Sequence, residues 1–454
     1  MKTQFILGSL FMTLSAFAQM HSVERLSPNQ IKESCFYPET VLNFTIDVKQ
    51  KKNLVKLCSI DAYSASTDPD VKNTLMCPKL TSSSPGLYLI ENENRLSSAD
   101  FKQKVCATRR PQKLVDGEDF KKLAKFKTSL GYTKAHSSII YNYLSKMIFE
   151  NLTVPEAVFR SLDYIEQKKE VVFALTQIEK LKIPKTQIIV DSWVWLSQLY
   201  KSQKPPTDLK YNDQTILGIL IKDIKAIQYV EMAAGPTIDS KQEKNLSYQK
   251  VFSEKNIIQD YARIQKTEIQ ALIESQGLAD MLVIDTLLSQ RDRYGSYGNI
   301  HYIPEWLKIE NNEMTYEKAT LDDSKNHVIS TEVTAKQAQG YLLVKKIALL
   351  DNDGAIKNAN ENSNKKRNVV ARLNHLSQKT YTRLMKFNEQ LKNAANIENF
   401  KNAFLLKDTE MATIHTNLAE ITAILKNNCK TGFLKLDLNT ADITNQKMNG
   451  NICE

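Results

Sequence analysis

The chain has 454 residues, which at about 150 residues per domain predicts two or three domains or one large two-lobed unit. Hydrophobic residues make up 42% and charged residues 25%, which excludes a collagen-like or wholly disordered chain, and only 13 glycines favour helices over a turn-rich all-β fold. The formal net charge of +10 would attract anions such as phosphates or acidic polymers, but it does not choose among them.

The N-terminus has the pattern of a secretory signal peptide. Lys2 precedes an apolar run from Phe5 to Leu14, and the small-residue pattern at Ala16 and Ala18 follows. The run is shorter than the roughly 20 residues that span a bilayer. We therefore predict a signal peptide over residues 1–18, a mature chain without a transmembrane segment, and a secreted or periplasmic location.

Six cysteines in an exported chain indicate disulfides. Their clustering favours pairing within a front group of four, in an order that stays open, and between the two at the back: Cys35, Cys58, Cys77 and Cys106, then Cys429 and Cys453. No C-x-x-C spacing occurs, so we expect neither a zinc site nor thioredoxin-type redox chemistry.

The first third of the chain predicts a mixed architecture. Residues 19–110, broken by Pro and Ser clusters, predict an irregular segment tied by disulfides. Asp116-Gly117 lies between two runs that can be extended, which is a hairpin signal. Apolar residues at helical spacing predict a helix near 137–149, and the β-branched run 152–163 predicts a strand.

Further along, residues 225–236 predict a strand that ends at a Gly-Pro break, and residues 251–290 predict a long helix. Residues 300–303 predict a short strand, and 340–350 a buried strand that ends at Asp351-Asn352-Asp353-Gly354. A helical tail follows to about residue 427. The pair Trp193 and Trp195 is expected to pack in the core.

Three features in chain order suggest phosphoryl transfer. The first is a lysine on a strand before a helix, Lys125 or Lys127. The second is Asp292-Arg293 with Asn299 after a helix, and the third is an aspartate that closes a hydrophobic strand, Asp351. Phosphoryl transfer needs such parts, because the protein mainly positions groups and neutralises charge. Carboxylate and amide oxygens suit Mg²⁺ or Mn²⁺, and a lysine suits phosphates.

These residues also carry a family resemblance. IDTLLSQRDRYGSYGNIHY and IALLDNDGAI resemble the catalytic-loop and metal motifs of the atypical kinases of the Golgi casein kinase and four-jointed type, and more distantly of the phosphatidylinositol kinases. AKFK (124–127) resembles their lysine-bearing strand, which favours Lys127 over Lys125. The resemblance covers about residues 112–427 and implies Asp292 as the catalytic-loop acid. It also implies Asn299 and Asp351 as metal ligands, and Asp353 would assist or replace Asp351.

The chain departs from the family pattern in three places. The catalytic loop is longer than usual, and the stretch 304–340 is an insertion near the expected cleft. The helix 137–149 has no glutamate to pair with the lysine, so Glu150 or another element would serve. No glycine-rich loop is present, which leaves Gly86 or residues 128–132 to cover the phosphates. Arg293 is expected to be a structural ion-pair partner.

We therefore predict an α+β, two-lobed, protein-kinase-like fold with a small β-containing N-lobe and a mostly helical C-lobe. The predicted boundaries are 1–18 for the signal peptide, 19–110 for the cysteine-containing segment, 111–235 for the N-lobe and 236–454 for the C-lobe. The predicted activity is transfer of the ATP γ-phosphoryl group, with Mg²⁺ or Mn²⁺, to a hydroxyl of a protein, sugar or lipid, and no nucleic acid is expected as a partner. The alternatives are a nucleotide-binding pseudokinase and a non-catalytic helical envelope or adhesion protein.

Overall fold

The computed structural model describes residues 19–64, 67–68, 70–82, 84–93, 96–108, 120–130, 133–149, 151–181, 187–201, 204, 209–229, 246–253, 266–291, 293, 300–310, 313–322, 327–356, 362–438 and 453. The expected signal peptide lies outside these residues. The described chain forms two β-sheets and many α-helices, so the predicted α+β class is confirmed.

The larger sheet has eight strands in the order β1-β2-β7-β8-β6-β5-β4, with β3 paired to β2. All of these pairs are antiparallel. The strands are β1 Gln19–Leu26, β2 Lys32–Val41, β3 Phe44–Thr45, β4 Thr74–Pro78, β5 Gly86–Glu91, β6 Lys122–Lys127, β7 Ala157–Asp163 and β8 Thr215–Lys222.

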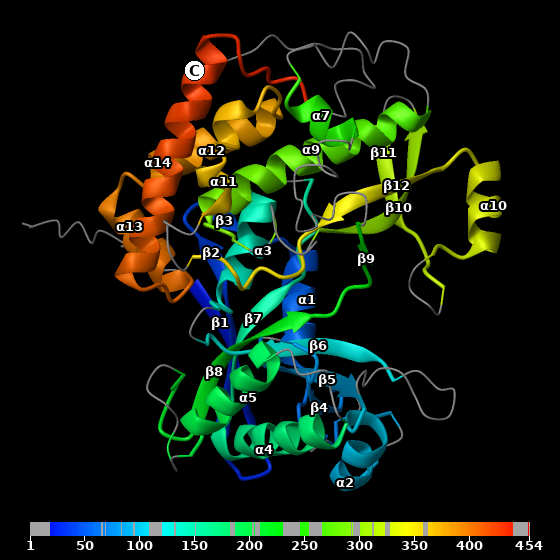
Figure 1. Ribbon diagram of the computed structural model, residues 1–454, viewed down its shortest axis with the longest axis vertical. Helices are drawn as coiled ribbons and strands as arrows, with labels where there is room; N and C mark the ends of the chain where they lie inside the picture. The colour runs from blue at the N-terminus through cyan, green and yellow to red at the C-terminus, as the bar shows by residue number, and fades with distance from the viewer. Residues whose placement is uncertain are drawn as a thin grey trace, which may run out of the picture.

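Helices cover both faces of the middle of this sheet. Every residue of β7 is buried, and α1 (Val48–Cys58), α3 (Ser137–Met147) and α4 (Tyr164–Lys180) pack against this strand, with α3 above it and α4 below it in the view of Figure 1. The neighbouring helix α5 (Gln187–Leu199) lies against α4. Strand runs buried on both faces read as continuous apolar sequence, as in the ILGILI of β8.

The smaller sheet has the order β11-β10-β12, with β9 paired to β10. Its strands are antiparallel: β9 Ile227–Gln228, β10 His301–Glu310, β11 Glu313–Lys318 and β12 Leu342–Ala348. The end of β12 is held by the segment before β7, since the Thr153 N–H donates to the Ile347 carbonyl oxygen at 3.0 Å and the Leu349 N–H donates to the Thr153 carbonyl oxygen at 2.9 Å. These two bonds fix where the chain leaves β12.

A second group of helices surrounds α9 (Lys266–Leu287), at the upper end of the molecule in Figure 1. Residues 271–287 of α9 are buried on all sides, as expected for a helix inside a core. α9 packs against β12, α7 and α14. The other helical elements are α2 Ser98–Phe101, a π-helical turn Lys102–Cys106, α7 Leu246–Val251, α10 Ser330–Ala338, α11 Ser363–Lys366, a 3₁₀ turn Val370–Arg372, α12 Gln378–Gln390, α13 Ala394–Ala403 and α14 Asp408–Lys430.

The cysteines form three disulfides: Cys35 with Cys58, Cys77 with Cys106, and Cys429 with Cys453. The predicted pairing within the front four and within the back two is therefore confirmed, and the structure settles the order within the front four. Among the described helices, none has the length and apolar character needed to cross a bilayer.

Several predicted elements are confirmed, namely α3, β7, β12 and the helical tail, and within the predicted helix 251–290 the structure has α9. The predicted strand 300–303 is longer, because it continues as β10. The stretch 304–340 forms the rest of β10 with β11 and α10. Of the predicted strand 225–236, the described residues contribute only β9.

One prediction about the front of the chain is wrong. Residues 19–110 are not irregular, since they supply β1 to β5 and the helix α1. The predicted hairpin turn at Asp116-Gly117 lies outside the described residues. The strand that follows it, β6, pairs with β5 on one edge and with β8 on the other.

A closed cluster of buried charges joins β2 to β7. The Nη2 group of Arg160 donates to the Glu33 carboxylate at 3.0 Å, and its Nη1 group donates to the Cys58 carbonyl oxygen at 3.3 Å. The same carboxylate accepts hydrogen bonds from the Tyr63 hydroxyl and from the Asp163 N–H. Both charged side chains are almost completely buried, at 3% and 1% exposure. We refer to Glu33, Tyr63 and Arg160 as the closed cluster.

Candidate active site

The two predicted phosphate-binding lysines lie on β6, in the larger sheet. Lys125 and Lys127 are two residues apart on a strand, so their side chains point to the same face. The Lys127 side chain is only 3% exposed, and that of Lys125 is 17% exposed. A buried ammonium requires a counter-charge, and the chain supplies it from far along the sequence.

That counter-charge is the acidic turn, Asp351-Asn352-Asp353, which follows β12. The Lys127 Nζ atom lies 2.8 Å from Oδ2 of Asp353 and 3.5 Å from Oδ1 of Asp351. The Lys125 Nζ atom lies 3.3 Å from the same Asp351 oxygen. The structure therefore brings together four of the predicted site residues, from the larger sheet and from the end of the smaller one.

The middle residue of the acidic turn holds it in place. The Asn352 side chain accepts a hydrogen bond from Arg293 Nη2 at 2.6 Å and donates to the Leu349 carbonyl oxygen at 3.0 Å. Its backbone carbonyl accepts from the Ser137 hydroxyl at the start of α3. Because Asn352 is turned into the protein, the two flanking aspartates face the lysines.

Two more contacts fix the backbone on either side. The Lys134 N–H donates to the Asp353 carbonyl oxygen at 2.8 Å, and the Gln290 side-chain amide donates to the Asp351 carbonyl oxygen at 3.2 Å. These donors come from the loop before α3 and from the residues after α9. Hydrogen bonds within the protein therefore hold the acidic turn in place without a ligand.

The charges of the cluster stabilise one another. Burial acts to lower the pKa of Lys127, but Asp353 and Asp351 outweigh it and raise that pKa above its ordinary value. Lys125 and Lys127 hold the pKa of Asp351 well below the usual range. Burial acts to raise the pKa of Asp353, but Lys127 outweighs it and lowers that pKa. Both carboxylates are therefore charged at neutral pH.

Lys79 is a third lysine of this site, and the sequence did not single it out. It follows β4, and its N–H donates to the Gly86 carbonyl oxygen at 2.8 Å, while Gly86 pairs in register with Lys127. Cross-strand neighbours share a face, so Lys79 lies on the face that carries the other two lysines. Burial and Lys127 lower the pKa of Lys79 to about 7, and among the described residues its ammonium has no ion-pair partner.

The glycine between these lysines stands where a side chain would be crowded. A Cβ atom on Gly86 would meet the Phe126 carbonyl oxygen at 3.0 Å and the Cγ atom of Lys127 at 3.3 Å. Next to it, the Ser84 hydroxyl donates to Oδ2 of Asp353 at 3.1 Å. The turn between β4 and β5 therefore covers the acidic turn, and Gly86 keeps the Lys127 stem free.

Arg293 is a structural residue, as predicted. Its Nε donates to Oδ2 of Asp285 at 2.9 Å, and the other oxygen of Asp285 accepts from the Tyr141 hydroxyl at 2.7 Å. Arg293 is completely buried and reaches Asn352 with its remaining end. Its chain neighbour Asp292 and the predicted metal ligand Asn299 lie outside the described residues.

The expected glutamate partner of Lys127 does not come from α3. Within the described residues, the ion pairs of Lys127 are those with Asp351 and Asp353, and Glu150 lies outside this set. Glu410 at the start of α14 instead binds the residues before α3, with Oε1 at 2.7 Å from Lys134 Nζ and Oε2 at 3.3 Å from His136 Nε2.

The donor chemistry of the acidic turn suits a divalent cation. One oxygen of each aspartate contacts a lysine, whereas in the described part of the chain the second oxygen accepts no hydrogen bond. Charged carboxylate oxygens are the ligands that Mg²⁺ and Mn²⁺ prefer. The described residues contain no group of three or more His, Cys, Asp or Glu arranged to hold a metal, so a further ligand is needed.

No family model matches the chain, and no curated protein matches it either. Among solved structures, the chain is similar to the Golgi casein kinase at 10% identity and a TM-score of 0.36, over 80% of this chain and 76% of that one. A structure of the Golgi casein kinase with Mn and ADP bound gives 10% identity and a TM-score of 0.37, over 84% and 80%. A likeness this low establishes neither a shared family nor a shared activity.

Proposed function

We propose that the chain is an exported, metal-dependent phosphotransferase with a kinase-like two-lobed fold, which transfers the ATP γ-phosphoryl group to a hydroxyl. The observation that carries the proposal is the pairing of buried Lys127 with Asp353 at 2.8 Å and with Asp351 at 3.5 Å. A phosphoryl transfer of this kind needs a lysine that contacts the phosphates and carboxylates that bind a metal ion. The three disulfides support export.

In this proposal the larger sheet with its helices, up to residue 235, forms the N-lobe, and residues 236–454 form the C-lobe. Lys127 and Lys125 contact the phosphates, and Lys79 adds positive charge from the neighbouring strand. Three lysines against two aspartates leave one positive charge uncompensated when all of them are ionised, which favours an anionic ligand.

Asp351 and Asp353, with Asn299 as the further ligand, would hold Mg²⁺ or Mn²⁺, which when bound neutralises negative charge on the phosphates. In the reaction, the acceptor oxygen forms a bond to the γ-phosphorus while the bond to the bridging oxygen breaks, and ADP leaves with that electron pair. Asp292 accepts the hydroxyl proton of the acceptor. Arg293 positions this segment through Asn352.

Thermal unfolding with ATP and Mn²⁺ tests the site. We expect ligand-dependent stabilisation of the mature chain, since a ligand at 100 times its Kd contributes about 2.7 kcal/mol. Asp351→Asn should abolish it. Asp213→Asn is the matched control, because Asp213 is 77% exposed and its ion pair within the described residues is with Lys210, three residues away. Stabilisation that survives in Asp351→Asn would contradict the proposed metal site.

Turnover is tested separately with Asp292→Asn. An enzyme loses ATP-dependent phosphoryl transfer in this variant while it keeps the ATP and Mn²⁺ stabilisation. If the wild-type chain shows stabilisation without transfer to any acceptor, it is a nucleotide-binding pseudokinase. No stabilisation in any condition would contradict both readings and favour a non-catalytic envelope or adhesion protein.

A further inference from the structure

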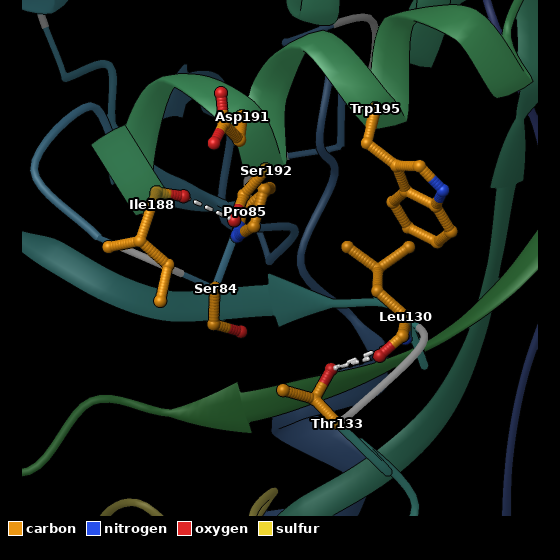
Figure 2. Close-up of a pocket in the computed structure, with 8 residues that line it drawn as sticks. All are labelled: Ser84, Pro85, Leu130, Thr133, Ile188, Asp191, Ser192 and Trp195. Atoms are coloured by element: carbon orange, nitrogen blue, oxygen red, sulfur yellow. Dashed lines mark hydrogen bonds between the residues drawn. The ribbon is translucent and has the colours of Figure 1, made fainter. Parts of the chain in front are cut away.

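An apolar pocket of about 480 Å³ lies beside the acidic turn. Three segments line it: the turn before β5, the loop between β6 and α3, and α5 (Figure 2). We call it the α5 pocket, and its lining residues are Ser84, Pro85, Leu130, Thr133, Ile188, Asp191, Ser192 and Trp195. Its volume falls within the range of about 300–1,000 Å³ that is usual for small-ligand sites.

One face of α5 supplies half of the lining. Ile188, Asp191, Ser192 and Trp195 have the spacing i, i+3, i+4 and i+7, which places them on one side of a helix. The opposite side carries Trp193 and is packed into the core. The expectation that both tryptophans pack in the core therefore holds for Trp193, at 1% exposure, and is wrong for Trp195, at 41%.

Trp195 extends from α5 toward Leu130 across the α5 pocket, as Figure 2 shows. Ile188, near the other end of this helix face, is 55% exposed. Large apolar side chains exposed together in a concave surface indicate a binding site for an apolar group.

The hydrogen-bonding groups of the lining are largely in use. The Ser192 hydroxyl donates to the Ile188 carbonyl oxygen at 2.7 Å, and the Thr133 hydroxyl donates to that of Leu130 at 3.1 Å. The Ser84 hydroxyl donates to Asp353. The Leu130 N–H donates to the Thr133 hydroxyl oxygen at 3.3 Å. Pro85 has no N–H to offer. A nucleobase would bury its ring nitrogens here without partners, whereas an apolar side chain would lose nothing.

The α5 pocket is joined to the proposed reaction centre. Ser84 contacts the Asp353 side chain, and Lys134, the residue after Thr133, donates its N–H to the Asp353 carbonyl oxygen. No lysine or arginine lines the pocket, and Asp191 adds an exposed carboxylate. The phosphates are therefore excluded from the pocket and remain with the three lysines. A neutral apolar group bound here lies next to them.

We propose that the α5 pocket binds a large apolar side chain of a peptide acceptor, close in sequence to the serine or threonine that receives the phosphoryl group. The acceptor role rests on the proposed function. A peptide fits better than an anionic lipid or an acidic polymer, because it can offer a neutral apolar side chain to a lining that has no lysine or arginine and carries the carboxylate of Asp191. The proposal predicts a preference for tryptophan or leucine, and against glutamate, at one position near the acceptor residue.

The experiment uses the mature chain with ATP and Mn²⁺ and a set of alanine-glycine peptides with one central serine. Tryptophan, alanine or glutamate is placed in turn at each of the three positions on either side. We expect kcat/KM to rise on the order of ten-fold for tryptophan over alanine at one position, as for burial of an aromatic side chain, and to fall for glutamate.

Ile188→Asn should remove this preference, and Val194→Asn should keep it. Val194 is on the same helix, is 38% exposed and is not part of the lining, so it is a matched control for an exposed apolar residue. Since Ile188 is also exposed, neither variant should change the melting temperature by much. A preference that survives in Ile188→Asn, or equal rates for tryptophan and alanine peptides, would overturn the proposal.

Binding of the same peptides, labelled with fluorescein and followed by anisotropy with ADP and Mn²⁺, separates the two proposals. Tryptophan-dependent binding that Ile188→Asn abolishes, without any transfer, would keep the pocket assignment and overturn the phosphotransferase. Transfer without any tryptophan preference in binding or rate would keep the phosphotransferase and overturn the pocket assignment. A change in the Kd of ATP, but not of inorganic tripolyphosphate, in Ile188→Asn would instead place the nucleobase in the pocket and overturn the proposal.

Discussion

Two groups of buried charges in this molecule differ in how completely each charge is paired with an opposite charge or a hydrogen bond. The closed cluster has one arginine against one carboxylate, and a hydroxyl, an N–H and a carbonyl complete it. The site at the acidic turn has three lysines near two aspartates, and Asp351 remains 36% exposed. The first arrangement is typical of a structural element. The second keeps positive charge and open carboxylate oxygens available, as a binding site requires.

The largest expected effect is a difference in the free energy of unfolding between variants of the closed cluster and variants of the site at the acidic turn. Arg160→Met leaves Glu33 buried without its ion-pair partner, and we expect a loss of about 3–5 kcal/mol in the free energy of unfolding. Lys127→Met should cost less, because Asp353 keeps the Ser84 hydroxyl and Asp351 keeps Lys125 and contact with solvent. Urea unfolding of both variants, with ATP and Mn²⁺ stabilisation measured in parallel, checks this.

In that pair of variants, Arg160→Met should keep the nucleotide response of whatever fraction remains folded, and Lys127→Met should lose it. The comparison fails if Lys127→Met is the more destabilised of the two and still responds to the nucleotide.

The next effect concerns the disulfide that ties the closed cluster. Cys35 pairs in register with Arg160, and the carbonyl of Cys58 accepts from it, so the disulfide closes a segment with a sequence separation of 23 around this cluster. We expect Cys35→Ala with Cys58→Ala to cost about 2–5 kcal/mol. Thermal unfolding measures this loss, and the response to ATP and Mn²⁺ should persist, since no disulfide contacts the acidic turn among the described residues.

The smallest expected effect is that the stability contributions of Asp351 and Glu33 change with pH in opposite directions. The pKa of Asp351 is depressed in the folded state, so its contribution is present above its ordinary pKa of 3.8 and is lost as the pH falls through the folded value. Burial raises the pKa of Glu33 above 4.5, so its contribution grows as the pH falls through the folded value toward 4.5.

Urea unfolding of Asp351→Asn and Glu33→Gln between about pH 3 and 7 tests this difference, at roughly 1.4 kcal/mol for each unit of pKa shift. Asp351→Asn should lose stability relative to wild type at pH 7 and approach it at the acid end. The Glu33→Gln curve should separate from wild type in the opposite direction. Parallel curves for the two variants would contradict the assigned shifts.

The residues of the site that could be predicted from the sequence are those that lie in or directly after a strand with a recognisable local pattern. The alternation around Lys127 and the apolar run before Asp351 each define a strand, and the joint order of the motifs placed them in one site. Lys79 and Ser84 were missed, because they enter through strand pairing between β4 and β5, in a segment whose Pro and Ser clusters suggested irregular structure. Asp285 was missed as the partner of Arg293 because it looks like an ordinary polar position on a helix.

Other elements were missed for similar physical reasons. The run TILGILIK forms β8, which is buried on both faces, and such a run does not show the alternation of a half-exposed strand. α4 and α5 were not predicted at all, and with α5 the pocket was missed, since it forms only when this helix is placed over the loops at the end of β6. Contacts between distant segments decide these features.

The amide of Asn352 faces Arg293, while the carboxylates on either side of it face the lysines, and this alternation restricts how the segment can change in evolution. A substitution of either aspartate alters one charge, but the loss or gain of a single residue in the turn would exchange the roles of its positions. A carboxylate would then face the buried Arg293 and an amide would face the lysines. We therefore expect related chains to vary in the length of the loops around this turn, while the three-residue count between its anchors stays fixed.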